Sequence, residues 1–221
     1  MYEYVTNSES RQFRQVCSDI LTKTRDNLRD NYDIISQFTL VGSGARNLIT
    51  RDGNGQYDLD YNLEILKAPD SIWNNLRFLK DTVRNCLNQA IGGSFSDWQD
   101  STSVLTSLLY FEDNRSVKFR VDVAIVKKDS EGNLERLIHM KSSRNLGIIG
   151  HFMWNKAPDS HDVFWKARII KEKGQWFQVR NKYLELKNMY LERQDNDHPS
   201  FIVYVEAVNE IYYKIKGGTR K

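Results

Sequence analysis

The chain has 221 residues, of which 40% are hydrophobic and 28% charged, a composition typical of a globular protein that is long enough to bury a core. Its net charge of +3 is too small to predict a polybasic DNA-binding surface. No apolar run approaches the ~20 residues that span a bilayer, and the opening MYEYVTNSES lacks the basic and apolar regions of a signal peptide. We therefore expect a cytoplasmic protein with no membrane partner, in which Cys17 and Cys86 are buried free thiols.

The first part of the chain predicts a helix followed by two strands. The sequence TNSE at positions 6–9 fits a capping box, and apolar residues then recur at helical spacing to about Asn31. An apolar run at 34–41 predicts a strand that ends at Gly42. After a polar loop, the run at 57–66 alternates between polar and apolar residues, which predicts a second strand.

The middle of the chain predicts a long helix and then a β-meander. Pro69-Asp70-Ser71 opens the helix, and its apolar stripe continues to Ala90 before Gly92-Gly93 stops it. Strand-like runs follow at 104–112, 116–126 and 134–140. Asp113-Asn114-Arg115 predicts a hairpin turn between the first two of these runs.

The last third of the chain predicts helices. Residues 147–162 have the composition of an irregular connector, and helical periodicity then recurs at 163–171, 176–190 and 201–215. From residue 160 to the end there are 12 Lys or Arg against 8 Asp or Glu, a mild basic excess that permits RNA binding without requiring it. We expect an α+β fold, with a mixed β-sheet core flanked by helices in residues 1–150 and a C-terminal helical bundle in residues 151–221.

Gly42-Ser43 is a candidate anion-binding turn. It follows a strand and begins a short helical turn, where unpaired backbone N–H groups favour phosphate, and glycine lets the phosphate approach the backbone closely. A plain tight turn fits the same pattern. The phosphate loop of the P-loop enzymes is excluded, because no Gly-Lys-Ser/Thr follows.

Three aspartates are the candidate metal ligands. Asp58 and Asp60 are two residues apart on the alternating strand, so both side chains project from the same face, and Asp122 interrupts a later apolar strand. Two adjacent acids repel each other unless a cation lies between them, and Mg²⁺ takes one or two carboxylates together with phosphate oxygens. A solvent-facing acidic edge remains the alternative for each aspartate taken alone.

Taken together, Gly42-Ser43, Asp58-Leu59-Asp60 and Asp122 resemble the signature of the nucleotidyltransferase superfamily, which includes DNA polymerase β, antibiotic nucleotidyltransferases and the oligoadenylate and cyclic-dinucleotide synthases. The resemblance covers roughly residues 34–126, and the loop at 44–57 is longer than is typical. It implies transfer of a nucleoside monophosphate from an NTP such as ATP to an acceptor hydroxyl, with release of pyrophosphate.

The resemblance also implies roles for individual residues. Asp58 and Asp60 would hold two Mg²⁺ ions, for which Mn²⁺ could substitute, and Asp122 would share one ion and help remove the proton of the acceptor. Gly42 and Ser43 would hold the β- and γ-phosphates. Arg46 could reach the triphosphate, although a surface role fits its position equally well.

Two other functions remain open from the sequence. A non-catalytic nucleotide or RNA sensor could keep the same fold, although it would have no need of all three acids. A metal-dependent phosphodiesterase would use the acids but leaves Gly42-Ser43 without a task. The acceptor, which could be a small molecule, a nucleotide, RNA or a protein, is not predicted, because acceptor pockets carry no shared motif.

Overall fold

The computed structural model describes residues 1–53, 55–92, 95–110, 117–141, 150–157, 161–195 and 198–217. The chain divides into two compact units. The sheet unit comprises residues 6–45 and 55–157, and the helical unit comprises residues 1–5, 46–54 and 158–221. The predicted mixed sheet flanked by helices is confirmed, whereas the boundary at residue 150 remains a prediction.

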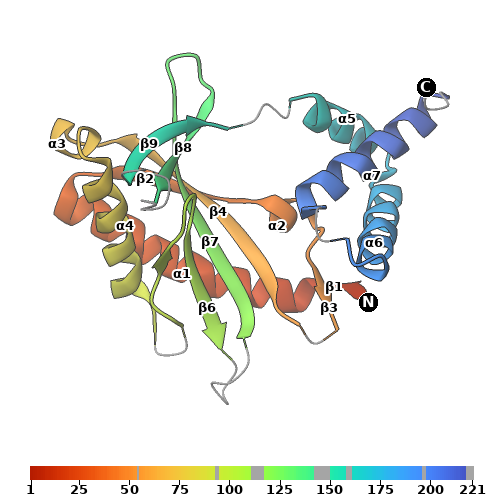
Figure 1. Ribbon diagram of the computed structural model, residues 1–221, viewed down its shortest axis with the longest axis horizontal. Helices are drawn as coiled ribbons and strands as arrows, with labels where there is room; N and C mark the ends of the chain where they lie inside the picture. Colours follow the sequence, from red (N-terminus) through yellow and green to blue (C-terminus); the bar gives the residue numbers. More distant parts are fainter. Residues whose placement is uncertain are drawn as a thin grey trace. The chain divides into compact units, whose positions relative to one another are not determined.

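The sheet unit contains a mixed sheet in the strand order β2-β4-β7-β6-β5, with β8 paired to the end of β7 and β9 paired to β8 (Figure 1). Its strands are β2 (Ile35–Val41), β4 (Tyr57–Lys67), β5 (Gln99–Asp100), β6 (Leu105–Tyr110), β7 (Val117–Lys128), β8 (Leu134–Met140) and β9 (His151–Lys156). β4 and β7 pair in parallel, and the other named pairs are antiparallel. The longest strands, β4 and β7, are therefore neighbours in the sheet.

One face of β4 and β7 is buried beneath helix α1 (Asn7–Tyr32). Phe13 of α1 contacts the rings of Tyr57 on β4 and Phe119 on β7, and all three side chains are buried. Because strand side chains alternate between faces, the residues next to Tyr57 and Phe119 point away from α1. This alternation places Asp58 on the opposite face of the sheet, which we call the acid face.

Helix α1 begins as predicted, since the Thr6 side chain accepts a hydrogen bond from the Glu9 backbone N–H at 3.3 Å. Cys17 and Cys86 are free and buried, which confirms that prediction. None of the helices in the described residues combines the length and the apolar content needed to cross a membrane.

Two predictions about the elements of the sheet unit are wrong. The single helix expected from residue 70 to 90 is two helices, α3 (Asp70–Trp73) and α4 (Leu76–Ala90). The side chain of Asn75 caps α4 by accepting a hydrogen bond from the Phe78 backbone N–H, which starts a new helix there. The expected irregular connector contains strand β9, and the expected hairpin turn at residues 113–115 lies outside the described residues.

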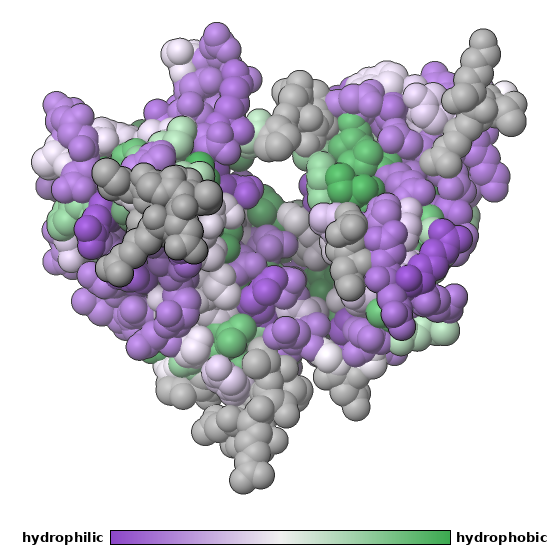
Figure 2. Space-filling view, in the orientation of Figure 1, coloured by the Kyte–Doolittle hydropathy of each residue, from purple (hydrophilic) through white to green (hydrophobic). Residues whose placement is uncertain are grey.

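The helical unit is the predicted helical bundle with a small sheet added. Its elements are β1 (Tyr2–Tyr4), β3 (Thr50–Asp52), α5 (His161–Glu172), α6 (Trp176–Glu192) and α7 (Ser200–Ile215). Its core includes Ile170, Val179 and Val208, which are all buried. Figure 2 shows a green apolar patch on the surface of this unit. Phe164 of α5 and Ile202 of α7 are among the exposed hydrophobic residues of the unit.

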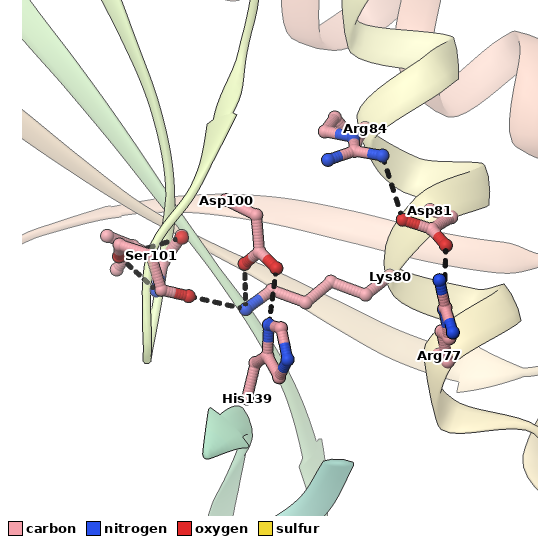
Figure 3. A network of polar contacts seen from close by, with 8 residues as sticks. Arg77, Lys80, Asp81, Arg84, Asp100, Ser101 and His139 are labelled. Carbon is pink, nitrogen blue, oxygen red and sulfur yellow. Dashed lines mark hydrogen bonds and ion pairs between the residues drawn. The ribbon is translucent and has the colours of Figure 1, made fainter. Parts of the chain in front are cut away.

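A buried ion pair joins α4 to the edge of the sheet unit (Figure 3). Lys80 Nζ lies 2.6 Å from Asp100 Oδ1 and donates a hydrogen bond to the Ser101 carbonyl at 2.8 Å. The second oxygen of Asp100 lies 2.7 Å from His139 Nδ1, so that α4, β5 and β8 meet at one carboxylate. Burial lowers the pKa of Lys80 from its usual value, whereas the contact with Asp100 opposes that shift.

Candidate active site

The three predicted aspartates lie on adjacent parallel strands. Asp58 and Asp60 are on β4 and Asp122 is on β7, and the register places Asp60 directly opposite Asp122. Leu59 and Tyr61, which alternate with the two acids on β4, are buried on the α1 side. The strand geometry alone therefore sends all three carboxylates to the acid face.

The Gly42-Ser43 turn adjoins the same acids. Val41, the last residue of β2, pairs with Asp60, so the chain leaves the sheet beside that carboxylate. Gly42 has φ +61°, and a Cβ at this position would overlap Asp60 Oδ2. Only glycine combines this backbone conformation with so close an approach to the acid.

A residue of another helix also holds the Gly42-Ser43 turn in place. The turn forms α2 (Gly42–Arg46), and Arg14 of α1 donates a hydrogen bond to the Gly44 carbonyl at 2.9 Å. A Cβ on Gly44 would lie 3.0 Å from Leu40 Cδ1, so this residue is closely packed as well. The sequence identified the turn but gave no sign of the contact with Arg14, because the two residues are far apart in the chain.

The clustering of acids changes the protonation of Asp60. The pKa of Asp60 is raised from 3.8 to about 6, first by burial and then by the negative charges of Asp122 and Asp58. Arg120 and Arg136 act in the opposite direction. The charged form of Asp60 is therefore the one that a cation on the acid face would stabilise.

Two residues that the sequence did not single out contact the aspartates directly. Arg120 Nη2 donates a hydrogen bond to Asp58 Oδ2 at 3.0 Å, and its Nε lies 3.3 Å from Asp122 Oδ2. The hydroxyl of Thr106 on β6 donates to Asp122 Oδ1 at 2.5 Å. The sequence positions of both residues could have indicated this contact. Arg120 is two residues from Asp122 and so lies on the same face of the strand, and Thr106 falls in the preceding strand-like run.

The donor set fits a hard divalent cation, because carboxylate oxygens are the ligands that Mg²⁺ takes from proteins. As the side chains stand, no group of three or more Asp, Glu, His or Cys side chains in the described part of the chain is arranged to hold an ion. Asp58 and Asp122 are each paired with Arg120 instead. The strands supply only the shared face on which the three carboxylates lie.

Arg46 has a different environment from the other predicted site residues. It falls in the helical unit, and its guanidinium lies 4.5 Å from the ring centroid of Tyr204 and 5.5 Å from that of Phe164. Cation–π contacts of this kind stabilise the packing of an arginine against aromatic rings. The predicted contact of Arg46 with a triphosphate remains a prediction, as do the roles of the other site residues.

The mixed sheet, with its acid strands adjacent and parallel, matches the nucleotidyltransferase fold of DncV. Among solved structures, the chain is similar to the GTP-bound form of Vibrio cholerae DncV, with a TM-score of 0.64 and 12% identity over 99% of this chain and 69% of that chain. Escherichia coli DncV bound to 3′-deoxy GTP gives a TM-score of 0.61 and 14% identity over 93% and 68% of the two chains.

A further similar structure is Escherichia coli MS115-1 CdnC with ATP, which gives a TM-score of 0.54 and 17% identity over 94% of this chain and 62% of that chain. At these identities the likeness shows a shared fold. No protein-family model matches the sequence, and no curated protein has a matching sequence.

Proposed function

We propose that the protein is a metal-dependent nucleotidyltransferase that transfers a nucleoside monophosphate from an NTP to an acceptor hydroxyl and releases pyrophosphate. One observation carries the proposal: Asp60 is paired with Asp122 on one side and with the end of β2 on the other, so that the acids and the Gly42-Ser43 turn adjoin. The turn that we propose for phosphate binding thus adjoins the acids that we propose for cation binding, which supports transfer from an NTP.

The chain's own residues have separable tasks in this reaction. Gly42, which has no side chain, would let a phosphate approach the backbone of the turn, and Ser43 would add a hydroxyl donor beside it. Asp122 would accept the proton of the acceptor hydroxyl, and the hydroxyl of Thr106 fixes the orientation of its carboxylate. Strand β7 fixes the position of Asp122 on the acid face, β6 supplies Thr106, and the end of β2 positions the Gly42-Ser43 turn beside Asp60.

Asp58, Asp60 and Asp122 would together hold the divalent cations. Bound there, Mg²⁺ or Mn²⁺ would supply the positive charge that offsets charge developing on the phosphate oxygens and lowers the pKa of the acceptor hydroxyl. The raised pKa of Asp60 is consistent with this task, because groups clustered against their own charge are common at catalytic sites.

The proteins of similar fold suggest which substrates to test first. Vibrio cholerae DncV is described as a cyclic AMP-GMP synthase and has been solved with the linear intermediate pppA(3′,5′)pG, and CdnC has been solved with ATP. We therefore propose ATP and GTP as the first donors and the hydroxyl of a second nucleotide as the first acceptor. RNA, small-molecule and protein acceptors would give different labelled products in the same assay.

The test is incubation of the purified protein with each α-labelled NTP, alone and in pairs, with Mg²⁺ or Mn²⁺, followed by product separation and pyrophosphate measurement. We expect a nucleotide adduct and pyrophosphate, both lost in Asp60→Asn and Asp122→Asn. Glu64→Gln is the matched control, because Glu64 lies on the same face of β4 but is paired with Lys128. The proposal fails if the two aspartate variants keep the activity of the control, or if the NTP is only hydrolysed.

A further inference from the structure

Arg120 forms a bridge between two of the three aspartates. It lies opposite Asp58 in the register of β4 and β7 and two residues before Asp122 on β7. Its guanidinium contacts Asp58 Oδ2 at 3.0 Å through Nη2 and Asp122 Oδ2 at 3.3 Å through Nε. One cation therefore contacts an oxygen of Asp58 and an oxygen of Asp122, two of the three acids that the proposed metal site would use.

The bridge has a direct physical reason. Carboxylates on the same face of paired strands repel each other, and a guanidinium keeps its charge at every pH at which the protein is folded. The planar guanidinium of Arg120 donates a hydrogen bond to Asp58 through Nη2 while its Nε lies within ion-pair distance of Asp122, an arrangement that a lysine ammonium on a flexible stem reproduces less well. Arg120 thus offsets the repulsion when no divalent cation is present.

The same contacts oppose cation binding. An oxygen that accepts from Arg120 must exchange that partner for a metal ion, and the arginine charge repels the incoming ion at short range. Asp122 is only 13% exposed, so screening by water is limited on that side of the bridge, whereas Asp58 is 43% exposed.

We infer that Arg120 is a built-in counter-ion of the aspartate cluster, which occupies Asp58 and Asp122 in the metal-free protein and must leave them before a divalent cation binds. Arg120 is therefore a positioning residue that sets the cation affinity of the site. This inference rests on the proposed function, because it assumes that the three aspartates are the cation ligands.

The test is titration of the protein with Mn²⁺ without nucleotide, following the free ion by electron paramagnetic resonance, a readout that does not depend on activity. We expect Arg120→Gln to bind Mn²⁺ roughly tenfold more tightly than the wild type, since two competing ion pairs are removed. Arg120→Lys keeps the charge but loses the planar guanidinium, and we expect an intermediate affinity. Lys128→Gln is the matched control: it removes a cation from the same strand, and its partner is Glu64 rather than an aspartate of the cluster.

Thermal unfolding gives a second readout. In chelator, Arg120→Gln should unfold at a lower temperature than the wild type, and saturating Mn²⁺ should raise its unfolding temperature by more than it raises that of the wild type. The inference is overturned if both Arg120 variants bind Mn²⁺ no more tightly than Lys128→Gln.

The proposed function fails separately. If the wild type binds no Mn²⁺, or if Asp60→Asn binds it as well as the wild type does, the aspartates are not the cation site and the inference falls with that assignment. If the wild type binds Mn²⁺ through Asp60 and the Arg120 variants leave the affinity unchanged, only the inference about Arg120 is wrong.

Discussion

Asp60 and Asp122 face each other across the parallel pair β4 and β7. Neighbouring strands lie about 4.8 Å apart, and residues in register send their side chains to the same face. The backbone therefore brings these two carboxylates together whatever rotamers they adopt. This is a costly arrangement for a protein without a ligand, and it leads to a measurable consequence for stability.

The first prediction concerns the stability of the metal-free protein. The pKa of Asp60 is raised from 3.8 to about 6, so the folded state binds this proton more tightly than the unfolded state does. Stability from this group is then present below about pH 4 and is lost as the pH rises to about 6. Asp60→Asn removes the charge, and at pH 8 in chelator we expect it to raise the free energy of unfolding by up to about 3 kcal/mol.

Urea unfolding at pH 8 and at pH 4 measures this effect. At pH 4 the increase in the free energy of unfolding caused by Asp60→Asn should be much smaller, because Asp60 is then mostly protonated in the folded wild type. An equal gain at both pH values would contradict the prediction. Glu64→Gln on the same face of β4 controls for the general loss of an acid.

The second prediction concerns the Gly42 turn. Gly42→Ala places a methyl group against Asp60 Oδ2 and forces alanine into φ +61°. We expect a loss of stability beyond the ~1–2 kcal/mol of the left-handed conformation alone. NTP binding, measured by calorimetry, should also weaken, because the turn must move away from the acid.

Gly132→Ala is the matched control for this substitution. Gly132 also has a positive φ, +84°, in the same unit, but a Cβ there would meet nothing within 4 Å. The two variants share the backbone strain and differ in the overlap with Asp60. Equal losses of stability and of NTP binding in both would show that contact with the acid is unimportant.

The acid strands could be predicted from the sequence because their pattern is local. Alternation of polar and apolar residues over 57–66 fixes which residues of β4 face the core, and it placed Asp58 and Asp60 together correctly. The contact between Gly42 and Asp60 depends instead on how β2 pairs with β4, and that register is not local information. For the same reason the bridge between Arg120 and Asp58 was not foreseen.

The break between α3 and α4 and the strand β9 were not predicted, and each omission has a local cause. The apolar stripe at 72–90 continues across Asn74 and Asn75, so the periodicity hides the break, whereas the Asn75 side chain competes for the backbone and caps a new helix. Strand β9 pairs only with β8 among the described strands, and its side chains are exposed or half-buried. It therefore lacks the buried face that makes a strand visible in a sequence.

The third prediction concerns Thr106. Its hydroxyl is the donor to Asp122 Oδ1, so Thr106→Val removes one hydrogen bond with little change in shape. Partners that orient a metal-binding carboxylate typically contribute 10–100-fold to affinity or activity, and we expect a loss of about tenfold in Mn²⁺ affinity and in turnover. Thr106→Ser retains the hydroxyl and should retain most of both. Loss in the serine variant as large as in the valine variant would attribute the effect to packing.

The last prediction concerns the ion pair in Figure 3, on the edge of the sheet unit. Lys80→Met removes the ammonium that contacts Asp100 Oδ1 and leaves this carboxylate, which is 18% exposed, with His139 Nδ1 as its neighbour. Breaking a buried pair on one side typically costs 3–5 kcal/mol, and with Asp100 partly exposed we expect about 2–4 kcal/mol from urea unfolding. Arg77→Gln on the same helix should cost under ~0.5 kcal/mol, because the Arg77–Asp81 pair is exposed to solvent.

The double variant Lys80→Met/Asp100→Asn distinguishes the effect of the unpaired Asp100 charge from the effect of lost packing around Lys80. If the cost of Lys80→Met is mainly the unpaired charge of Asp100, the double variant should be more stable than the sum of the two single changes predicts. Strict additivity would mean that packing of the lysine stem accounts for the loss instead. Mn²⁺ affinity should stay at the wild-type value in all of these variants, because none of them changes a residue of the acid face.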